Sequence, residues 1–311
     1  MLGACGGHGD YAGNEVDALA LNTDTPQWVQ LHAPTPAPDI VNLTQFFLDY
    51  RPSPTHTYWA TQFIDSLDRM IILDSPGMNW NNLPSPPAGW PYGNGGQGGW
   101  NFSFDLAVNE WDLPNQTGYP IANFPGTGDW TACLCVKHQT TNDIYYSQNG
   151  GAFYHWSSST NTWTEVNSNV NFGGYAGAAM DPTRNRILAV GSFGGNVAPQ
   201  VLDLTGTPVP GATVSGAATA TLSTASGYPG IVYDEVNDNF LVFLNDSVSG
   251  SIALYRVDAS TFAIDQPATG GPSPQARQNG IMNSVQYVPE LRGIVLANNY
   301  SGNVFFMRTS A

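Results

Sequence analysis

The chain has very few basic residues. Its 311 residues include nine lysines and arginines against 24 acidic residues, so the formal net charge is −15, and Lys137 is the only lysine. Nucleic acids and anionic membranes bind proteins through clustered Lys and Arg side chains, and a negative net charge repels both. The composition therefore excludes nucleic acid and anionic membrane surfaces as expected partners.

Long apolar runs and cysteines are also scarce. No apolar run reaches the roughly 18 residues that predict a membrane-spanning helix. The opening MLGAC resembles a lipoprotein cleavage site, but no basic or apolar segment precedes it, so we expect no signal peptide in this chain. Among only three cysteines, Cys133 and Cys135 stand too close for an ordinary disulfide, and no second pair completes a zinc site. The fold must then be stabilised by its core.

Charged residues make up only 11% of the chain, and no long amphipathic helical stretch occurs. Instead there are 34 glycines, 23 prolines and 12% aromatic residues. This composition is typical of short strands joined by many turns. A chain of this length can form one large all-β domain.

A hairpin pattern recurs along the chain. It is clearest in YAGAAMDPTRNRILAVGSFGG from Tyr175, YPGIVYDEVNDNFLVFLND from Tyr228 and MNSVQYVPELRGIVLANN from Met282, where TRNR, VNDN and ELRG occupy the same place between two apolar strands. Similar hairpins start near His56 and Cys135. Polar turns of this kind predict tight antiparallel hairpins, and Asp181 and Asp234 are expected to cap them.

A second hairpin follows the first in most repeats. A strand ending in Asp or Ser leads through a polar turn to a strand that opens on Trp28, Trp111, Trp163 or Phe262. Four antiparallel strands repeated about every 45 to 55 residues predict the blades of a β-propeller. The prediction is a single domain over residues 1–311 with six blades, at about 1–33, 55–114, 130–167, 174–216, 228–266 and 280–311.

The first and last blades are expected to be incomplete. The first begins in its second strand, and the last stops after its third strand. The incomplete first blade could be completed by the C-terminus, by upstream residues that this chain lacks, or by a strand from another chain.

The glycine pair Gly6 and Gly7, the aromatic residue after it and the later Trp28 resemble the kelch pattern. GGHGDYAGNEV is similar to the opening blade of bacterial and phage kelch-like proteins related to the galactose oxidase propeller. The resemblance covers most of the chain as architecture and is close in residues over the first two blades. It implies an all-β, kelch-type propeller with four-stranded antiparallel blades. The copper-ligand set of galactose oxidase finds no matching positions here, so no oxidase activity is implied.

Binding residues are expected on one face of the propeller, which is formed by the loops between second and third strands and by the starts of the innermost strands. Tyr175, Tyr228 and Asn279 lie at such strand starts. The longest loop of this face spans residues 78–100. Aromatic rings stack on the apolar faces of sugars, and amides bond sugar hydroxyls. The predicted ligand-binding residues are Tyr11, Asn14, Trp80, Trp90, Tyr92 and Trp100. The alternative is that proline and tryptophan pack together only to keep the long loop compact.

Catalytic candidates are weak. His8 with Asp10 offers a base and an orienting carboxylate, and His56 starts an innermost strand on the same face, but no HExxH or paired-cysteine motif accompanies them. Glu15 and Asp129 are the other acids near this face, and His138 and His155 are expected at the opposite end of a strand and in a third strand. No cofactor or metal is expected; a bound cation is compatible with the sequence but not signalled by it.

Three functions remain open at this point. The first is a non-enzymatic recognition or structural propeller, extracellular or on a virion surface, that binds a glycan or a protein through the long loops. The second is a carbohydrate-active lyase or hydrolase with its site over the central channel. The third is an assembly subunit that pairs strands through its incomplete blade, which would make the chain part of a homo-oligomer or larger assembly.

Overall fold

The structure is a computed structural model, and it describes the larger part of the chain in two compact units. The units are Met1–Thr131 with Ser159–Trp163, and Ala132–Ser158 with Thr164–Ala311. The described residues are 2–4, 13–42, 44–54, 57–75, 83–92, 100–114, 119–125, 134–147, 152–167, 172, 175–191, 198–206, 210–212, 214–216, 218–223, 228–277, 280–297 and 302–310. No helix within these ranges is long and apolar enough to cross a membrane.

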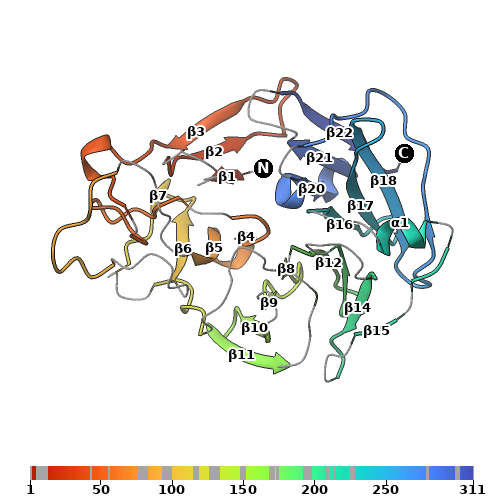
Figure 1. Cartoon of the computed structure of the whole chain (residues 1–311), viewed down its shortest axis with the longest axis horizontal. Coiled ribbons are helices and arrows are strands. Elements are labelled where there is room, and N and C mark those ends of the chain that lie inside the picture. The colour runs from red at the N-terminus through yellow and green to blue at the C-terminus, as the bar shows by residue number, and fades with distance from the viewer. Residues whose placement is uncertain are drawn as a thin grey trace. The chain divides into compact units, whose positions relative to one another are not determined.

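The described residues form six antiparallel sheets of three or four strands, in each of which neighbouring strands follow one another in the chain (Figure 1). Only one α-helix occurs among them, the five-residue α1 (Thr219–Ser223). The all-β class and the repeated four-strand unit predicted from the sequence are confirmed to this extent. The single domain over residues 1–311 stays a prediction.

The first unit contains two sheets around one apolar core. The first sheet is β1 (Leu2–Ala4), β2 (Val16–Leu19) and β3 (Trp28–His32), and the second is β4 (Thr61–Ile64), β5 (Arg69–Ser75), β6 (Trp100–Asp105) and β7 (Glu110–Trp111). The core includes Val16, Phe46, Met70, Phe102 and Phe104. Three of these residues belong to strands β5 and β6, which are therefore buried against the rest of the unit.

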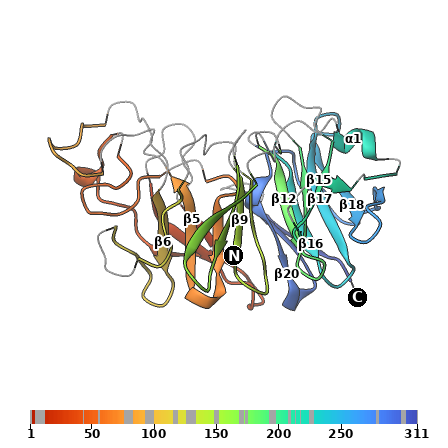
Figure 2. The same cartoon turned by 90° about the horizontal axis from the view of Figure 1, so that it is seen from below.

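Four sheets make up the rest of the described structure. Their strands are β8 (Leu134–Lys137), β9 (Ile144–Ser147), β10 (Phe153–Ser157), β11 (Thr162–Asn167), β12 (Gly177–Asp181), β13 (Arg186–Val190), β14 (Gln200–Asp203), β15 (Pro210–Ala212), β16 (Gly230–Asp234), β17 (Asn239–Asp246), β18 (Ser251–Asp258), β19 (Ile264–Asp265), β20 (Val285–Val288), β21 (Gly293–Ala297) and β22 (Val304–Arg308). In the second unit the first strands β8, β12, β16 and β20 lie beside one another in this order (Figure 1), and Figure 2 shows β12, β16 and β20 from another side. Apolar residues fill the spaces between neighbouring sheets of this unit.

The aspartates that end β12 and β16 build the hairpin turns. Asp181 is fully buried, and its carboxylate accepts the backbone N–H groups of Thr183 and Arg184 at 3.0 and 3.1 Å. Asp234 does the same for the two corresponding residues of its own turn. Each turn closes on a residue with a left-handed backbone, Asn185 at φ 51° and Asp238 at φ 56°. These hydrogen bonds confirm the predicted capping role of Asp181 and Asp234. Asp and Asn side chains favour such turns.

The turns after the third strands use the same chemistry. Asp203 ends β14 and accepts the backbone N–H of Thr205 at 2.9 Å. Asp258 ends β18 and accepts the backbone N–H groups of Ser260 and Thr261 at 3.0 and 2.7 Å. Opposite Asp203 across the sheet lies Arg186, at the start of β13. Arg69 and Asp105 face each other in the same way in the first unit, so the repeat seen in the sequence is also a repeat of register.

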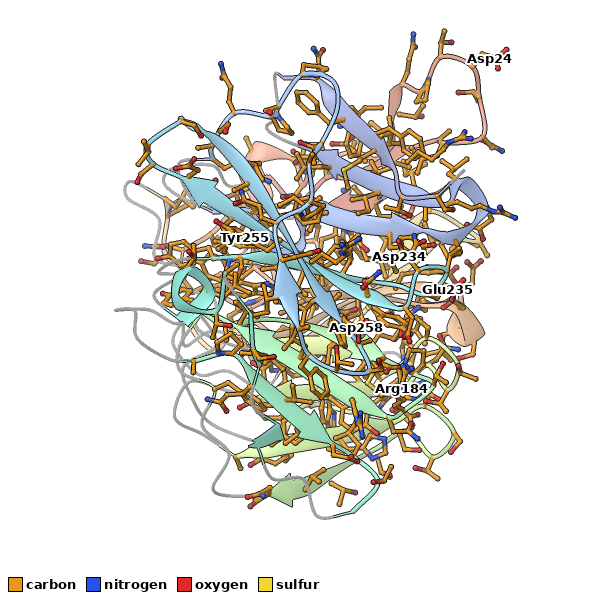
Figure 3. The ribbon with its side chains drawn as sticks, turned by 90° about the vertical axis from the view of Figure 1, so that its right-hand side faces the viewer. Asp24, Arg184, Asp234, Glu235, Tyr255 and Asp258 are labelled. Carbon is orange, nitrogen blue, oxygen red and sulfur yellow. The ribbon has the colours of Figure 1, made fainter. Side chains whose placement is uncertain are left out.

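These turns make the fold sensitive to acid. Hydrogen bonds from Ser260 and Thr261 lower the pKa of Asp258 to about 2, and bonds from Thr205 lower the pKa of Asp203. A carboxylate whose pKa is lower in the folded than in the unfolded chain contributes stability above the unfolded pKa of about 4. That contribution is lost as the pH falls toward the folded pKa. The side of the second unit that carries Asp258 is shown in Figure 3.

We therefore expect the unfolding temperature to drop between about pH 4 and pH 2. Asp258→Asn should be less stable than wild type near neutral pH, because the amide lacks the charge of the carboxylate. The two should be equally stable near pH 2, where protonation removes that charge from the wild-type side chain as well. Thermal unfolding followed by circular dichroism across this pH range measures the difference. Asp24→Asn, at an exposed position with no hydrogen bond among the described residues, is the control. If the unfolding temperature of Asp258→Asn fell between pH 4 and pH 2 as much as that of wild type, the role given to Asp258 would be wrong.

Two sheets have three strands within the described residues, β1–β3 and β20–β22. The fourth strands β7 and β11 carry a tryptophan near their start, and β3 likewise starts with Trp28. β3 therefore corresponds to a fourth strand, and β1 takes the place of a second strand. Both outer strands expose apolar side chains, with Trp28 43% and Phe306 48% exposed. This arrangement agrees with the predicted missing strands. Completion of the first sheet by a further strand stays a prediction, and so does assembly of the chain through that sheet.

Candidate functional site

The described middle part of the long loop, residues 83–92, folds onto the segment that precedes β4. Tyr92 accepts the backbone N–H of Gln45 at 3.0 Å, and Pro84 accepts that of Asn42 at 2.9 Å. Residues 83–92 are thus held by main-chain hydrogen bonds against residues 42–45. Loop residues fixed by a buried scaffold are where binding sites are commonly found.

This pairing creates an aromatic cluster in the first unit, formed by Phe46, Tyr50, Trp90, Tyr92 and Trp100. The ring of Tyr92 lies at its centre, with ring centroids 5.1 Å from Phe46, 5.6 Å from Trp90 and 5.6 Å from Trp100. These three pairs are edge to face. Tyr50 lies tilted against Trp90, with centroids 5.4 Å apart. Edge-to-face pairs at such distances are favourable beyond the area they bury.

Burial divides the cluster into an anchor and an accessible part. Phe46 is fully buried and also packs edge to face on Phe102 of β6, 5.0 Å away. Tyr50 is 37% exposed, and Trp90, Tyr92 and Trp100 are half-buried. Burial raises the pKa of the Tyr92 hydroxyl, with a further contribution from neighbouring Tyr50. The tyrosine therefore stays neutral at physiological pH.

Polar groups fix the accessible rings in place. The indole N–H of Trp90 donates to the backbone carbonyl of Phe46 at 3.3 Å. Tyr50 has a left-handed backbone with φ 65°, an uncommon and costly conformation for a bulky residue. Beside it, Asp49 and Arg51 form an ion pair with N and O atoms 3.6 Å apart. The cluster thus presents partly exposed ring surfaces next to charged and hydroxyl groups, a combination that suits stacking on a sugar.

The structure brings together three of the predicted ligand-binding residues, Trp90, Tyr92 and Trp100. It adds Phe46 and Tyr50, which the sequence analysis did not single out. Their signal was present in the run FFLDYRP from Phe46, which lies between two predicted blades and carries three aromatic residues. The packing alternative for the long loop describes part of the same contacts, because the rings pack on one another and still reach the surface.

Asn14 has a well-defined environment inside the first unit. Its side chain is fully buried, its amide N–H groups donate to Thr35 at 2.9 Å and Pro52 at 2.7 Å, and its amide oxygen accepts from the backbone of Thr35 at 2.7 Å. Ligand binding by Asn14 stays a prediction, and these bonds show that its amide holds segments 14, 35 and 52 together. The other predicted site residues, His8, Asp10, Tyr11, His56 and Trp80, lie outside the described residues, as does Asp129.

The two histidines with lesser roles lie where they were expected. His138 follows β8, where its imidazole accepts backbone N–H groups of the turn and contacts Asn185 at 3.1 Å. His155 on β10 pairs with Asp143 at 2.9 Å and stacks on Tyr145. Within the described ranges, no group of three or more His, Cys, Asp or Glu side chains is arranged to hold a metal ion.

No known protein family matches the chain, and no curated protein does. Similar solved structures include the β-propeller domain of Cps50 (Swd1) from Myceliophteria thermophila, with 12% identity, a TM-score of 0.43 and coverage of 83% of this chain and 63% of that chain. A protein from Lactobacillus plantarum has 12% identity and a TM-score of 0.43, with coverage of 69% and 59%. Hydrazine synthase from Kuenenia stuttgartiensis has 14% identity and a TM-score of 0.38, with coverage of 62% and 49%. The chain spans less than two thirds of the length of each.

Proposed function

We propose that the chain is a non-enzymatic recognition module that binds a glycan through the aromatic cluster. The observation that carries the proposal is the position of Tyr50, Trp90 and Tyr92, which meet in one place and remain partly exposed. Sugars present C–H faces that stack on rings and hydroxyls that bond polar side chains. Half-buried rings with polar groups beside them offer both contacts.

The cluster is also preorganised. Trp90 is bonded to Phe46, Tyr92 is bonded through its backbone to Gln45, and Phe46 is anchored in the core on Phe102. Side chains that are already ordered lose little entropy when a ligand binds, so more of the contact energy becomes affinity. This rigidity favours binding over a loop that merely keeps itself compact.

The wider setting belongs to the same proposal. The six sheets would be the blades of one kelch-type propeller over residues 1–311, displayed outside the cell or on a virion surface. In support, hairpins with the same turn chemistry recur from sheet to sheet, and arginine faces aspartate at the same register in two of them. The net charge of −15 also argues against nucleic acid as the ligand.

A glycan array probed with the purified chain, followed by calorimetry on the best ligand, tests the proposal. Trp90→Ala and Tyr50→Ala should each weaken binding by about tenfold or more, because a buried aromatic contact contributes about 2 kcal/mol at a hot spot. Trp28→Ala is the matched control, since Trp28 is an exposed tryptophan of the same unit outside the cluster. Binding to no glycan, or undiminished binding by Trp90→Ala, would refute the proposal.

A further inference from the structure

Most arginines of the chain are paired with aspartates, and half-buried Arg277 has no such pair among the described residues. Ion pairs within 4 Å join Arg51 to Asp49, Arg69 to Asp105 and Asp112, Arg184 to Asp181 and Asp238, Arg186 to Asp203, and Arg256 to Asp265. Arg277 is half-buried, and its side chain has one partner in the described structure, the backbone carbonyl of Ala297 at 3.1 Å. No carboxylate neutralises it there.

Arg277 is firmly positioned despite lying in a loop. The side-chain amide of Asn245, near the end of β17, donates to the carbonyl of Arg277 at 2.6 Å and accepts its backbone N–H at 2.9 Å. The guanidinium reaches Ala297, the last residue of β21. Among the described residues this contact uses one of its five N–H donors. Backbone and side chain are held by two different sheets of the second unit.

Burying a cation without a partner costs free energy. Desolvation by burial lowers the pKa of Arg277, as expected for a charge removed from water without a neighbouring anion. Replacing such a residue usually stabilises a fold, and a perturbed charge of this kind often marks a functional site. Five other arginines are paired with acids, and Arg292 and Arg308 are exposed, whereas Arg277 is half-buried with no acidic partner among the described residues.

Two tyrosines are connected to the Arg277 loop through Gly280, whose backbone N–H donates to the carbonyl of Arg277 at 3.3 Å. Gly280 has φ 86° and packs so tightly on Tyr228 that a Cβ at this position would stand 2.0 Å from the Cβ of Tyr228. The Tyr228 ring meets Tyr175 edge to face, with centroids 4.9 Å apart. Both tyrosines have left-handed backbones, at φ 65° and 62°, and each lies two residues before a first strand, β16 or β12. Bulky residues held in this conformation cluster at binding sites.

We propose that Arg277 binds the carboxylate of an acidic sugar, a uronate, and that Tyr228 and Tyr175 provide the adjoining ring surface. The planar guanidinium fork matches a carboxylate, which it can bind with two parallel hydrogen bonds. A single carboxylate on a sugar suits one arginine, whereas the net charge of −15 repels polyanionic peptides. This inference rests on the proposed glycan binding and adds a second site, within the second unit, together with the class of sugar it takes.

The test uses pairs of oligosaccharides that differ only in one carboxylate, such as a disaccharide with a single glucuronate residue and its carboxyl-reduced counterpart. Calorimetry with the purified chain should show about tenfold or greater preference for the uronate, the size expected for a charge-assisted hydrogen bond. Arg277→Gln should abolish the preference, and Arg277→Lys should retain part of it. Arg308→Gln removes the same charge from an exposed position on β22 and is the control. Arg277→Gln should melt at or above the wild-type temperature.

The outcomes separate this inference from the proposed function. If neutral sugars bind through Trp90 but no pair shows a carboxylate preference, the role of Arg277 is wrong and glycan binding stands. A uronate preference that persists in Arg277→Gln refutes the inference in the same way. If no sugar of either kind binds, both proposals fail.

Discussion

Replacement of Phe46 by alanine is expected to lower the free energy of unfolding by about 3–5 kcal/mol, the usual cost of removing a fully buried aromatic ring. Phe46 is fully buried and makes edge-to-face contacts with Tyr92, Trp100 and Phe102. Removing it leaves a cavity beneath the aromatic cluster and takes away the ring on which two of its members pack. The same substitution should therefore abolish glycan binding.

Denaturant unfolding followed by tryptophan fluorescence measures the stability change, since Trp90 and Trp100 report on this region. Phe46→Leu is the matched control, because it keeps most of the volume and should cost roughly 1 kcal/mol while preserving binding. Stability of Phe46→Ala within about 1 kcal/mol of wild type would show that the ring is not an anchor. A stable Phe46→Ala variant that still binds glycan would separate the cluster from the function.

The hairpins were predictable because their residues repeat a local pattern. In GIVYDEVNDNFLVF, for example, two apolar runs flank a turn of Asp and Asn, and β16 and β17 pair over these residues with Asp234 opposite Asn239. Side chains of this type form such turns wherever they occur. Because the information is local, no distant contact was needed to recognise it.

The aromatic cluster was predictable only in part. Trp90, Tyr92 and Trp100 share one long loop, so composition alone drew attention to them. Tyr50 and Phe46 lie some 40 residues earlier in a segment with neither strand nor helix periodicity. Their contact with the loop depends on main-chain hydrogen bonds between irregular segments. No periodic sequence pattern predicts such bonds.

Arg277 illustrates a different limit. In the sequence it is one of eight arginines that appear scattered, and nothing near it distinguishes it from Arg256. The distinction comes from which aspartates the fold brings within reach, and this depends on register. Arg256 faces Asp265 across β18 and β19, whereas Arg277 meets a carbonyl. Charge pairing across sheets is a property of the assembled fold.

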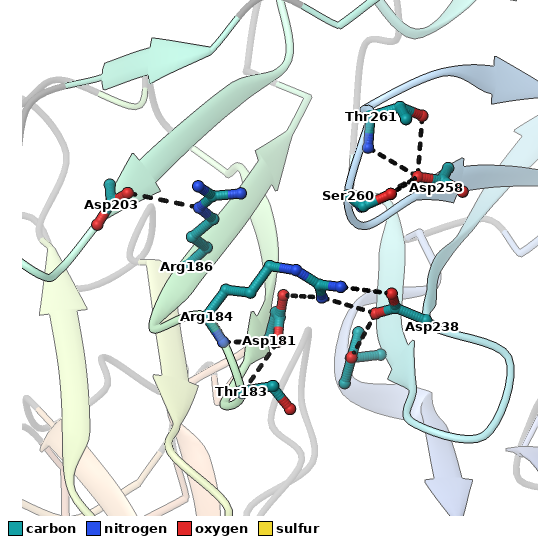
Figure 4. Close-up of polar contacts among 10 residues, drawn as sticks. Asp181, Thr183, Arg184, Arg186, Asp203, Asp238, Asp258, Ser260 and Thr261 are labelled. Carbon is teal, nitrogen blue, oxygen red and sulfur yellow. Dashed lines mark hydrogen bonds and ion pairs between the residues drawn. The ribbon is translucent and has the colours of Figure 1, made fainter.

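Replacement of Arg184 by glutamine is expected to lower the free energy of unfolding by about 2–3 kcal/mol, somewhat less than the loss of a fully buried ion pair, because the guanidinium is partly exposed. Arg184 lies in the turn after β12 and donates to Asp238 through two nitrogens, at 2.8 and 2.6 Å, and to buried Asp181 at 2.9 Å (Figure 4). One side chain therefore joins the turns of two neighbouring sheets of the second unit. Its loss would leave a buried carboxylate without its cation.

Arg256→Gln is the matched control, because Arg256 makes a similar pair with Asp265 that is 44% and 53% exposed. An exposed pair of this kind should contribute at most about 1 kcal/mol. Hydrogen bonding to Arg184 lowers the pKa of Asp238, so Arg184→Gln should also raise the pKa of that carboxyl, measurable by NMR titration. A double-mutant cycle with Asp238→Asn isolates the pair. If Arg184→Gln costs no more than Arg256→Gln, the network does not join the two sheets energetically, and their packing must rest on the apolar residues between them.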